Sequence, residues 1–359
     1  MGSQGAILII TLWIMAILIL FVFGLGFRMS LEARLTDYNA TEIKNLYRAK
    51  AAVTMLKAVI SEDGTEAYDY LGDNWSYNEE LFKDIEVGKN GGTFTISYVR
   101  AEGPALGFPR LRREASAERR AEKVFYGAMD EESKINIKEI ANIAKEEGTA
   151  LPEICREILL RLFSEADNAG EIVDCILDWI DDGDGSIVRT EGAESDYYET
   201  FGDFYYECKN GPLDSIEELL LIKGMRPAIF QTVKDKITVY GEGKVNLNTA
   251  DPGVLEIMGL HESVVDKIKE EVYGGEESIE GITEYGRFEK VDKSYLLSGL
   301  DLGDAAKNSN ILDLTGVTSN HFRAHITAKS KDGKIIKEAE AVVSRSGEKS
   351  EILSWYEPR

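Results

Sequence analysis

The chain of 359 residues contains few of the side chains on which most enzyme active sites are built. It has three histidines, and two of them, His321 and His325, share one face of a predicted strand, a spacing typical of structural positions. No glycine-rich phosphate-binding loop follows a strand. Serine, histidine and cysteine chemistry is therefore unsupported, and we expect no catalytic site and no small-molecule substrate.

Cysteine and proline are also scarce, with three and seven residues. Cys155, Cys175 and Cys208 have no metal-ligand spacing, and three cysteines cannot all pair within one chain. A disulfide between Cys155 and Cys175 would require an oxidising compartment, and the sequence leaves it open. No low-complexity tract occurs, and the roughly 330 residues after the N-terminal segment suffice for two domains.

Basic residues are too few to balance the acidic ones, so the net charge is −23. Asp130 to Glu199 alone carries −14. The negative electrostatic potential of such a segment repels nucleic acid and anionic lipid and attracts cations. An acidic surface can also serve solubility alone. One basic cluster, Arg110 to Arg120, is either a solvated loop or a docking surface for an acidic partner.

The longest apolar run extends from Ala6 to Phe27, and we predict a transmembrane helix over 6–28. About 22 residues at ~1.5 Å each can cross a hydrocarbon core of ~30 Å. The basic n-region and small-residue cleavage site of a secretory signal are not evident. Basic residues after the run, such as Arg28 and Arg34, would place the rest in the cytoplasm. The opening MGSQG weakens that inference, because it could be a cloning remnant or a misplaced start.

The remaining pattern predicts helices flanked by strands. Helical spacing continues from the apolar run to a turn at Ser61 to Gly64. Further helices are expected near 137–147, 152–167, 169–180, 214–223, 226–237, 250–258 and 262–273. Strands are expected over 93–99, 123–127, 321–328, 335–344 and 352–356, with a hairpin turn at 331–334.

This order of elements predicts an α+β fold. Because strands flank the helical block, we expect one antiparallel sheet packed on the N-terminal helix, with an all-α domain inserted between its strands. The expected boundaries are 29–128 and 311–359 for the helix and sheet, and 129–310 for the inserted domain.

The densest group of carboxylates follows the predicted helix over 169–180, in the segments Asp178 to Asp184 and Glu191 to Asp196. These carboxylates would repel one another unless a hard cation neutralised them, and Ca²⁺ accepts six to eight oxygens. The spacing is not that of an EF-hand, because Ile187 stands where glycine is required. A solvated acidic loop remains an alternative, and so does a glycosidase-like carboxylate pair.

Two segments, Leu213 to Met225 and Val245 to Leu260, resemble helix-hairpin-helix units. Asn248 or Thr249 is the expected N-cap ahead of Pro252, and the glycines near each helix end suit C-termini. Such units often bind DNA phosphates, but no basic patch surrounds them here. We therefore interpret them as a packing scaffold, with DNA binding as the alternative.

Several motifs, taken in order, resemble the minor pseudopilin K of bacterial type II secretion systems, the GspK family. They are Gly5 before the apolar run, Asp130 to Ile137, Asp178 to Asp181, Gly192 to Glu194, Tyr197-Tyr198, Lys209 to Pro212, Glu218-Leu219, Lys223 to Met225 and Val245 to Ala250. The resemblance covers nearly the whole chain. The short leader and the Arg-rich stretch between residues 101 and 122 depart from the family pattern.

The resemblance implies a pilin-like fold with a leader, residues 1–5, that prepilin peptidase removes between Gly5 and Ala6. It implies a single-pass inner-membrane protein whose globular part is periplasmic, which overrides the orientation inferred from charge. Its partners would be the pseudopilus filament and the minor pseudopilins I and J, with no nucleic acid. It also implies two calcium ions, and the candidate ligands are Asp181, Asp182, Asp184, Glu194 and Asp196, followed by Asp178, Glu191 and Asn210.

We therefore expect a non-enzymatic subunit that caps a periplasmic pseudopilus and starts its growth, so that folded proteins cross the outer membrane. The rivals are a minor pilin of a type IV pilus and a membrane-tethered DNA-binding protein. Counted from Ala6, the fifth residue is Ile10, where pilins generally carry Glu. A buried Glu in a filament needs a positive partner from a neighbouring subunit. A subunit with Ile there fits the tip.

Overall fold

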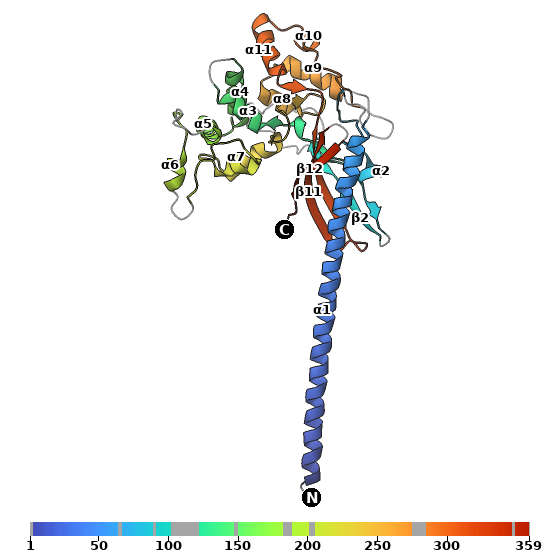
Figure 1. Ribbon diagram of the computed structural model, residues 1–359. Coiled ribbons are helices and arrows are strands. Elements are labelled where there is room, and N and C mark those ends of the chain that lie inside the picture. Colours follow the sequence, from blue (N-terminus) through green and yellow to red (C-terminus); the bar gives the residue numbers. More distant parts are fainter. Residues whose placement is uncertain are drawn as a thin grey trace, which may run out of the picture.

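The protein is described by a computed structural model that covers residues 3–63, 67–88, 91–101, 122–146, 150–181, 189–200, 205–274, 285–346 and 349–358. A long helical stalk carries a sheet at its upper end, and a group of shorter helices lies above and beside that sheet (Figure 1). The N-terminus lies at the free end of the stalk, far from the shorter helices. The predicted α+β class, with a long helix on an antiparallel sheet and an inserted helical region, is confirmed.

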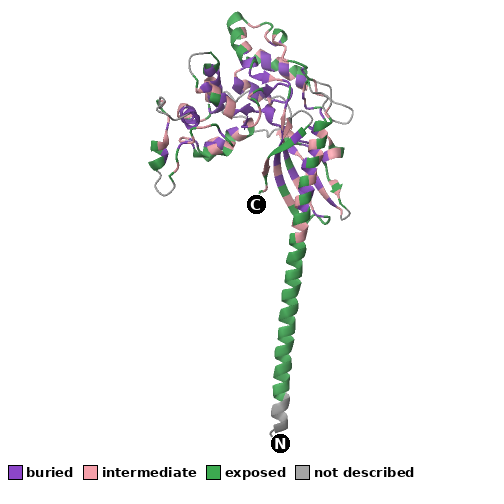
Figure 2. Cartoon of the chain, in the orientation of Figure 1, coloured by how far each residue is buried: buried purple, intermediate pink, exposed green. Residues whose placement is uncertain are grey.

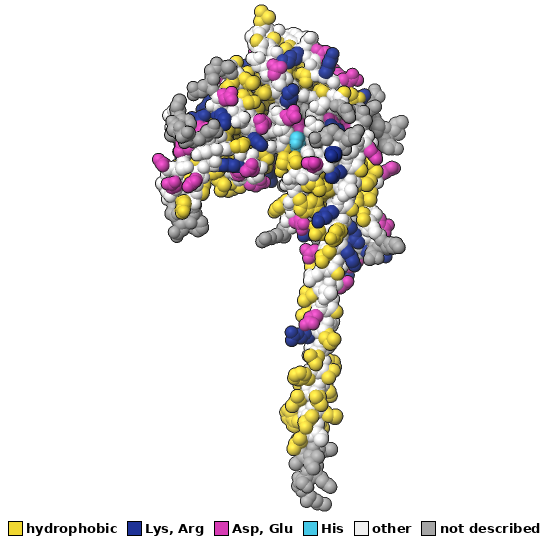
Figure 3. Space-filling model, in the orientation of Figure 1, with side chains coloured by type: hydrophobic (Ala, Val, Ile, Leu, Met, Phe, Trp, Pro, Cys, Tyr) yellow, Lys and Arg dark blue, Asp and Glu magenta, His cyan; other side chains and the backbone are white. Residues whose placement is uncertain are grey.

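The stalk is helix α1 (Ser3–Ser61), and most of it makes no contact with the rest of the molecule. Every side chain from Ile9 to Asn39 is exposed (Figure 2). Hydrophobic side chains gather along this exposed part (Figure 3). Among the described residues, α1 is the one helix long and apolar enough to cross a membrane. Because no described side chain before Ala40 is buried, residues 29–359 retain both hydrophobic cores.

The sheet packs against the upper part of α1. All of its strand pairs are antiparallel, and small side chains face the helix. Ala324 pairs with Ala341 in register, and both share a core with Ala49 and Ala52 of α1, so the helix and the sheet approach closely. The strand order is β1 (Ile85–Val87), β2 (Gly92–Ile96), β10 (His321–Lys329), β11 (Ile336–Ser346) and β12 (Lys349–Tyr356), with β5 (Met129–Asp130) also paired to β10.

The inserted region has its own hydrophobic core, built mainly from helices. Those helices are α3 (Ile137–Ala144), α4 (Ala150–Leu162), α5 (Ala169–Ile180), α6 (Ser195–Tyr198), α7 (Pro227–Val233), α8 (Pro252–Met258), α9 (Glu262–Tyr273), α10 (Lys293–Leu296) and α11 (Leu302–Leu312). The 3-10 helices are η1 (Glu131–Ser133), η3 (Ile216–Leu221) and η4 (Lys234–Lys236).

Short strands join parts of the chain that lie far apart in sequence. Parallel pairs link β6 (Ile135–Asn136) to β7 (Ile237–Thr238) and β8 (Val245–Asn246) to β9 (Thr315–Gly316). Between α1 and the sheet the chain forms α2 (Glu79–Phe82), and β3 (Tyr98–Ala101) pairs with β4 (Glu122–Phe125). The region expected to be all-α, residues 129–310, therefore also contains the parallel pair of β6 and β7, and the strand β8, whose partner β9 lies beyond residue 310.

The helices over 169–180 and 262–273 have the predicted bounds, but other segments differ. The strand predicted over 93–99 breaks at Ser97, because β2 pairs with β10 whereas β3 pairs with β4. The helix predicted over 214–223 is the 3-10 helix η3, and the one over 226–237 ends at Val233 before η4 and β7. In the second of these segments, pairing of β7 with β6 overrides the local helical pattern.

The predicted N-cap of α8 is also wrong. Asp251 caps this helix, because its side chain accepts a hydrogen bond from the Gly253 amide. Asn248 and Thr249 are buried instead. Thr249 donates to the carboxylate of Asp130, and Asn248 donates to the Phe288 carbonyl at 2.9 Å. These side chains join the start of the inserted region to its end.

Glu131 is the central buried charge between the sheet and the inserted region. Its side chain is 0% exposed and lies 2.7 Å from both Lys134 Nζ and Arg323 Nε. The hydroxyl of Thr238 in β7 donates to the same carboxylate. Burial raises the pKa of Glu131, but the charges of Lys134 and Arg323 outweigh burial and hold it well below its usual range. Because Arg323 lies on β10 and Thr238 on β7, this carboxylate couples the sheet to the helices.

Candidate metal centre

Helix α5 ends inside the core of the inserted region, and two carboxylates lie at its C-terminal end. Asp178 is in the last turn and is 0% exposed, and Asp181 is the C-cap. All nine residues from Ile172 to Ile180 are buried, which fixes the position of this helix end. The C-terminus of a helix carries partial negative charge, so carboxylates are unfavourable there without a nearby cation.

A third carboxylate comes from the chain segment that returns to α5. Glu194 is the N-cap residue of α6, and oxygens of Asp178, Asp181 and Glu194 lie within 4.8 Å of one another. Arg189 lies on the same returning segment. Its Nη1 atom is 2.5 Å from Asp178 Oδ1 and 3.0 Å from Asp181 Oδ2. Among the described residues of this group, one guanidinium thus faces three carboxylates.

The carboxylates of this group destabilise one another's charged forms. Burial raises the pKa of Asp178, although Arg189 opposes the rise. Burial also raises the pKa of Glu194, and the charges of Asp181 and Asp178 add to it. The group therefore has more negative charge than Arg189 neutralises.

One oxygen of the group lacks a partner. Asp178 Oδ2 is buried, and no hydrogen-bond donor among the described residues reaches it. This oxygen fits only because Gly192 has no side chain, since a Cβ atom on Gly192 would lie 1.6 Å from it. A buried carboxylate oxygen without a partner is costly, whereas Ca²⁺ is ligated by such oxygens. The residues present therefore fit a hard divalent cation.

Aromatic packing holds the two sides of the group together. Trp179 of α5 contacts Tyr198 of α6 edge-to-face, with ring centroids 5.2 Å apart. The Tyr198 hydroxyl accepts a hydrogen bond from the Lys223 amide at 3.3 Å. The Cys208 thiol donates to the Asp178 carbonyl at 3.6 Å. These contacts connect the motifs around residues 178, 197, 209 and 223, which lie apart in the sequence.

The other predicted ligands are not among the three converging carboxylates. Asp182 and Asp184 lie outside the described residues. Glu191, Asp196 and Asn210 are exposed. Their part in metal binding stays a prediction. Arg189 and Gly192 were not predicted as members of a site, because neither residue type is a metal ligand.

All three cysteines are free and buried, so the disulfide considered between Cys155 and Cys175 is absent. The Cys175 thiol instead donates to the Glu191 carbonyl at 3.4 Å. Burial raises the pKa of both Cys155 and Cys175 to about 12, which keeps these thiols protonated and unreactive.

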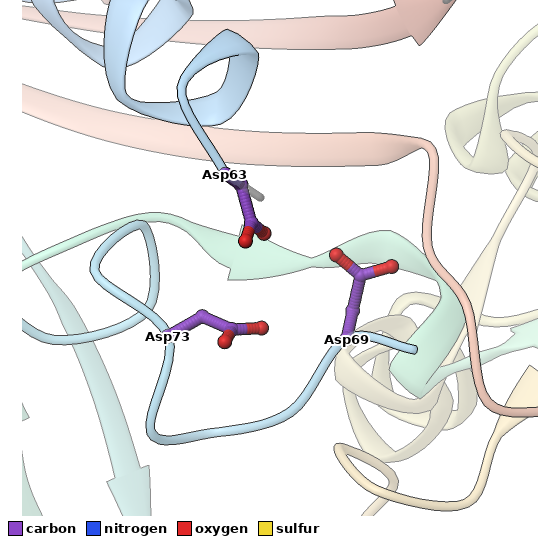
Figure 4. A group of neighbouring side chains, drawn as sticks. All are labelled: Asp63, Asp69 and Asp73. Atoms are coloured by element: carbon purple, nitrogen blue, oxygen red, sulfur yellow. The ribbon is translucent and has the colours of Figure 1, made fainter. Parts of the chain in front are cut away.

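A second acidic group, which we did not predict, lies beside the upper end of α1. Asp63 follows this helix, and Asp69 and Asp73 lie on the next loop, with the three side chains turned toward one another (Figure 4). Arg345 Nη2 lies 2.6 Å from Asp69 Oδ2. Burial raises the pKa of Asp69 to about 6 and that of Asp73 to about 7. No sequence signal marks this group, because only the fold of the loop brings its members together.

Three comparisons with known proteins agree with one another. Residues 133–242, which include Asp178, Asp181 and Glu194, match the family model described as type II secretion system (T2SS), protein K. Type II secretion system protein K of Klebsiella pneumoniae is 23% identical over 260 residues, which are 70% of this chain and 67% of the relative.

The third comparison is with a solved structure, the crystal structure of the GspK-GspI-GspJ complex from the enterotoxigenic Escherichia coli type 2 secretion system. One chain of that complex superposes with a TM-score of 0.64 at 16% sequence identity. The match covers 90% of this chain and 99% of that chain, so the two chains share one fold over most of their length.

Proposed function

Because this chain belongs to the GspK family, the family of type II secretion system protein K, we propose that it caps the tip of a periplasmic pseudopilus and initiates its assembly. A pseudopilus built in this way serves the export of folded proteins across the outer membrane. The family is a structural one, and we assign no catalytic residue.

The main support for a position at the tip of the pseudopilus is the location of the inserted region. It lies above the sheet, at the end of the stalk opposite the N-terminus (Figure 1). In a filament of parallel stalks, a further subunit stacked above this one would meet the inserted region. Ile10 supports the same position, because it is apolar and offers no carboxylate to a neighbour above.

We further propose that the minor pseudopilins I and J of the same system bind along the outer face of α1. This helix presents Tyr38, Ile43 and Tyr47 as exposed large hydrophobic side chains at its upper end. The related chain from Escherichia coli was solved in complex with GspI and GspJ. Exposed aromatic and aliphatic side chains of this kind are typical of the centres of protein interfaces.

Co-purification tests this proposal. Residues 29–359 should be retained by tagged pseudopilins I and J, and Tyr47→Asp should reduce retention at least tenfold, because a carboxylate would be buried in an apolar contact. Tyr205→Asp is a matched control, since both tyrosines are 66% exposed. Equal retention of the Tyr47 variant and the wild type would refute the assigned face, and no retention of the wild type would refute the complex.

The finer part of the proposal is calcium binding. Asp178, Asp181 and Glu194 would hold one ion, and the candidates at 182, 184, 191, 196 and 210 would complete this set or a second one. Calorimetry on residues 29–359 should detect Ca²⁺ binding that Asp181→Asn weakens at least tenfold, which is ~1.4 kcal/mol. Asp313→Asn is the control, because Asp313 is exposed and pairs with Lys293 instead. Unchanged binding in the Asp181 variant would exclude this ligand.

We also propose that α1 anchors the chain in the inner membrane, with the rest of the protein in the periplasm. Prepilin peptidase would cleave between Gly5 and Ala6. Mass spectrometry of the protein co-expressed with that peptidase should find Ala6 at the N-terminus, and an intact leader would contradict the assignment.

A further inference from the structure

Several features of the molecule have no assigned role. They are the two acidic groups, the buried charges between the sheet and the inserted region, and the free cysteines. Among them, Arg189 stands out, because it is a cation that already occupies part of the candidate metal centre. Its Nη1 atom contacts both Asp178 and Asp181, whose oxygens are also candidate metal ligands.

We propose that Arg189 is a tethered competitor of the divalent cation, so that its guanidinium and the metal ion exclude one another at Asp178 and Asp181. This inference rests on the metal centre proposed above. Two positive charges cannot share these oxygens without strong repulsion at such short distances. Arg189 therefore leaves the carboxylates when the ion is bound and returns when the ion is lost.

The geometry around Arg189 supports a replaceable occupant and not a permanent one. A single nitrogen of the guanidinium serves both aspartates, whereas a permanent Arg–carboxylate pair commonly uses two parallel hydrogen bonds. Asp178 Oδ2 is buried without a partner among the described residues, so Arg189 does not use all the oxygens that the group offers.

The backbone near Arg189 explains how the side chain reaches the group. The Gly192 amide donates to the Arg189 carbonyl at 2.9 Å, which closes a turn over the end of α5. The Arg189 side chain is 21% exposed, so a path to solvent exists when the ion displaces it. In the absence of the ion, Arg189 reduces the repulsion between Asp178 and Asp181 and keeps the returning segment on the helix.

The first test compares Ca²⁺ affinities by calorimetry on residues 29–359. Arg189→Gln should bind Ca²⁺ at least tenfold more tightly than the wild type, because the competitor is gone. Lys307→Gln removes the same charge at an exposed site paired with Glu157, and it should leave the affinity unchanged. In chelator the Arg189 variant should melt below the wild type, and saturating Ca²⁺ should close that gap.

Equal or weaker Ca²⁺ binding by Arg189→Gln would overturn the inference and leave the metal centre standing. Absence of Ca²⁺ binding in every variant, the wild type included, would overturn the metal centre and the inference together.

A second test uses the wild-type protein and needs no variant to fold. Phenylglyoxal modifies accessible arginines, and peptide mass spectrometry measures the rate at each site. Ca²⁺ should raise the modification rate of Arg189 severalfold. The modification rate of Arg161, which pairs with Glu157 outside the metal centre, should not change. An unchanged rate at Arg189 under saturating Ca²⁺ would show that the ion does not displace it.

Discussion

Replacement of Glu131 should uncouple the sheet from the inserted region. This carboxylate is fully buried and pairs with Lys134 and Arg323, each at 2.7 Å. Glu131→Ala leaves the nearly buried Lys134 ammonium without its partner. Breaking a buried ion pair from one side costs about 3–5 kcal/mol. Arg323 keeps Glu340 as a second partner, so we expect the lower part of that range, about 3 kcal/mol.

The conservative variant separates charge from packing. Glu131→Gln keeps the volume and one oxygen acceptor, but it loses the negative charge that Lys134 and Arg323 require. Hydrogen bonds to charged groups contribute about 1.5–3 kcal/mol, so the glutamine variant should lose about 2 kcal/mol. Glu338→Ala, at an exposed position of β11, should change stability by less than about 0.5 kcal/mol.

The assay is urea unfolding of residues 29–359, followed by circular dichroism. We expect one transition for the wild type and a broader or divided one for Glu131→Ala, because the two cores share this carboxylate. Since the pKa of Glu131 lies below its usual range, its contribution is complete above pH ~4.3 and is lost as the pH falls through the folded-state pKa.

The stability difference between the wild type and Glu131→Gln should therefore shrink on acidification below pH ~4.3. A cost below about 1 kcal/mol for Glu131→Ala would refute the reasoning, since it would fall outside the range for a broken buried pair. A wild-type-to-glutamine difference that stays constant on acidification would refute it as well.

Two further predictions concern the acidic groups. Gly192→Ala should destabilise the fold by about 1–3 kcal/mol and abolish Ca²⁺ binding, because its Cβ would overlap the Asp178 carboxylate, whereas Gly211→Ala should be neutral in thermal melts. Asp73 has a pKa raised to about 7 by burial, so its ionisation costs stability as the pH rises from ~4 through about 7. Asp73→Asn, which can still accept from Trp75 Nε1, should therefore melt above the wild type at pH ~8 in chelator, and a lower melting temperature there would contradict this account.

Much of the fold follows from local patterns. The helices over 169–180 and 262–273 have the predicted bounds. The second repeats a buried face every three to four residues, whereas the first is buried on all sides from Ile172 to Ile180. The strand β10 alternates buried side chains with half-buried or exposed ones as predicted, which leaves its two histidines off the core face. The strand over 93–99 was mispredicted as continuous, because its break at Ser97 depends on two different partner strands.

The sequence likewise predicted only some of the residues of the candidate metal centre. Asp178, Asp181 and Glu194 were candidates from the sequence, because carboxylates crowded near a glycine-containing loop repel one another. Nothing local distinguishes Arg189 or Gly192 from other residues of that segment. Their importance depends on where the chain returns to α5.

The sequence by itself determined what depends on short-range order. That includes the apolar stalk, the helices over 169–180 and 262–273, the C-terminal strands, the acidic segment and the motifs that resemble the GspK family. Only the tertiary structure decided which charges meet, because the energy of a buried charge depends on distant neighbours and on exclusion of water. Glu131 with Arg323, the group of Asp63, Asp69 and Asp73, and Arg189 between Asp178 and Asp181 all belong to that second kind.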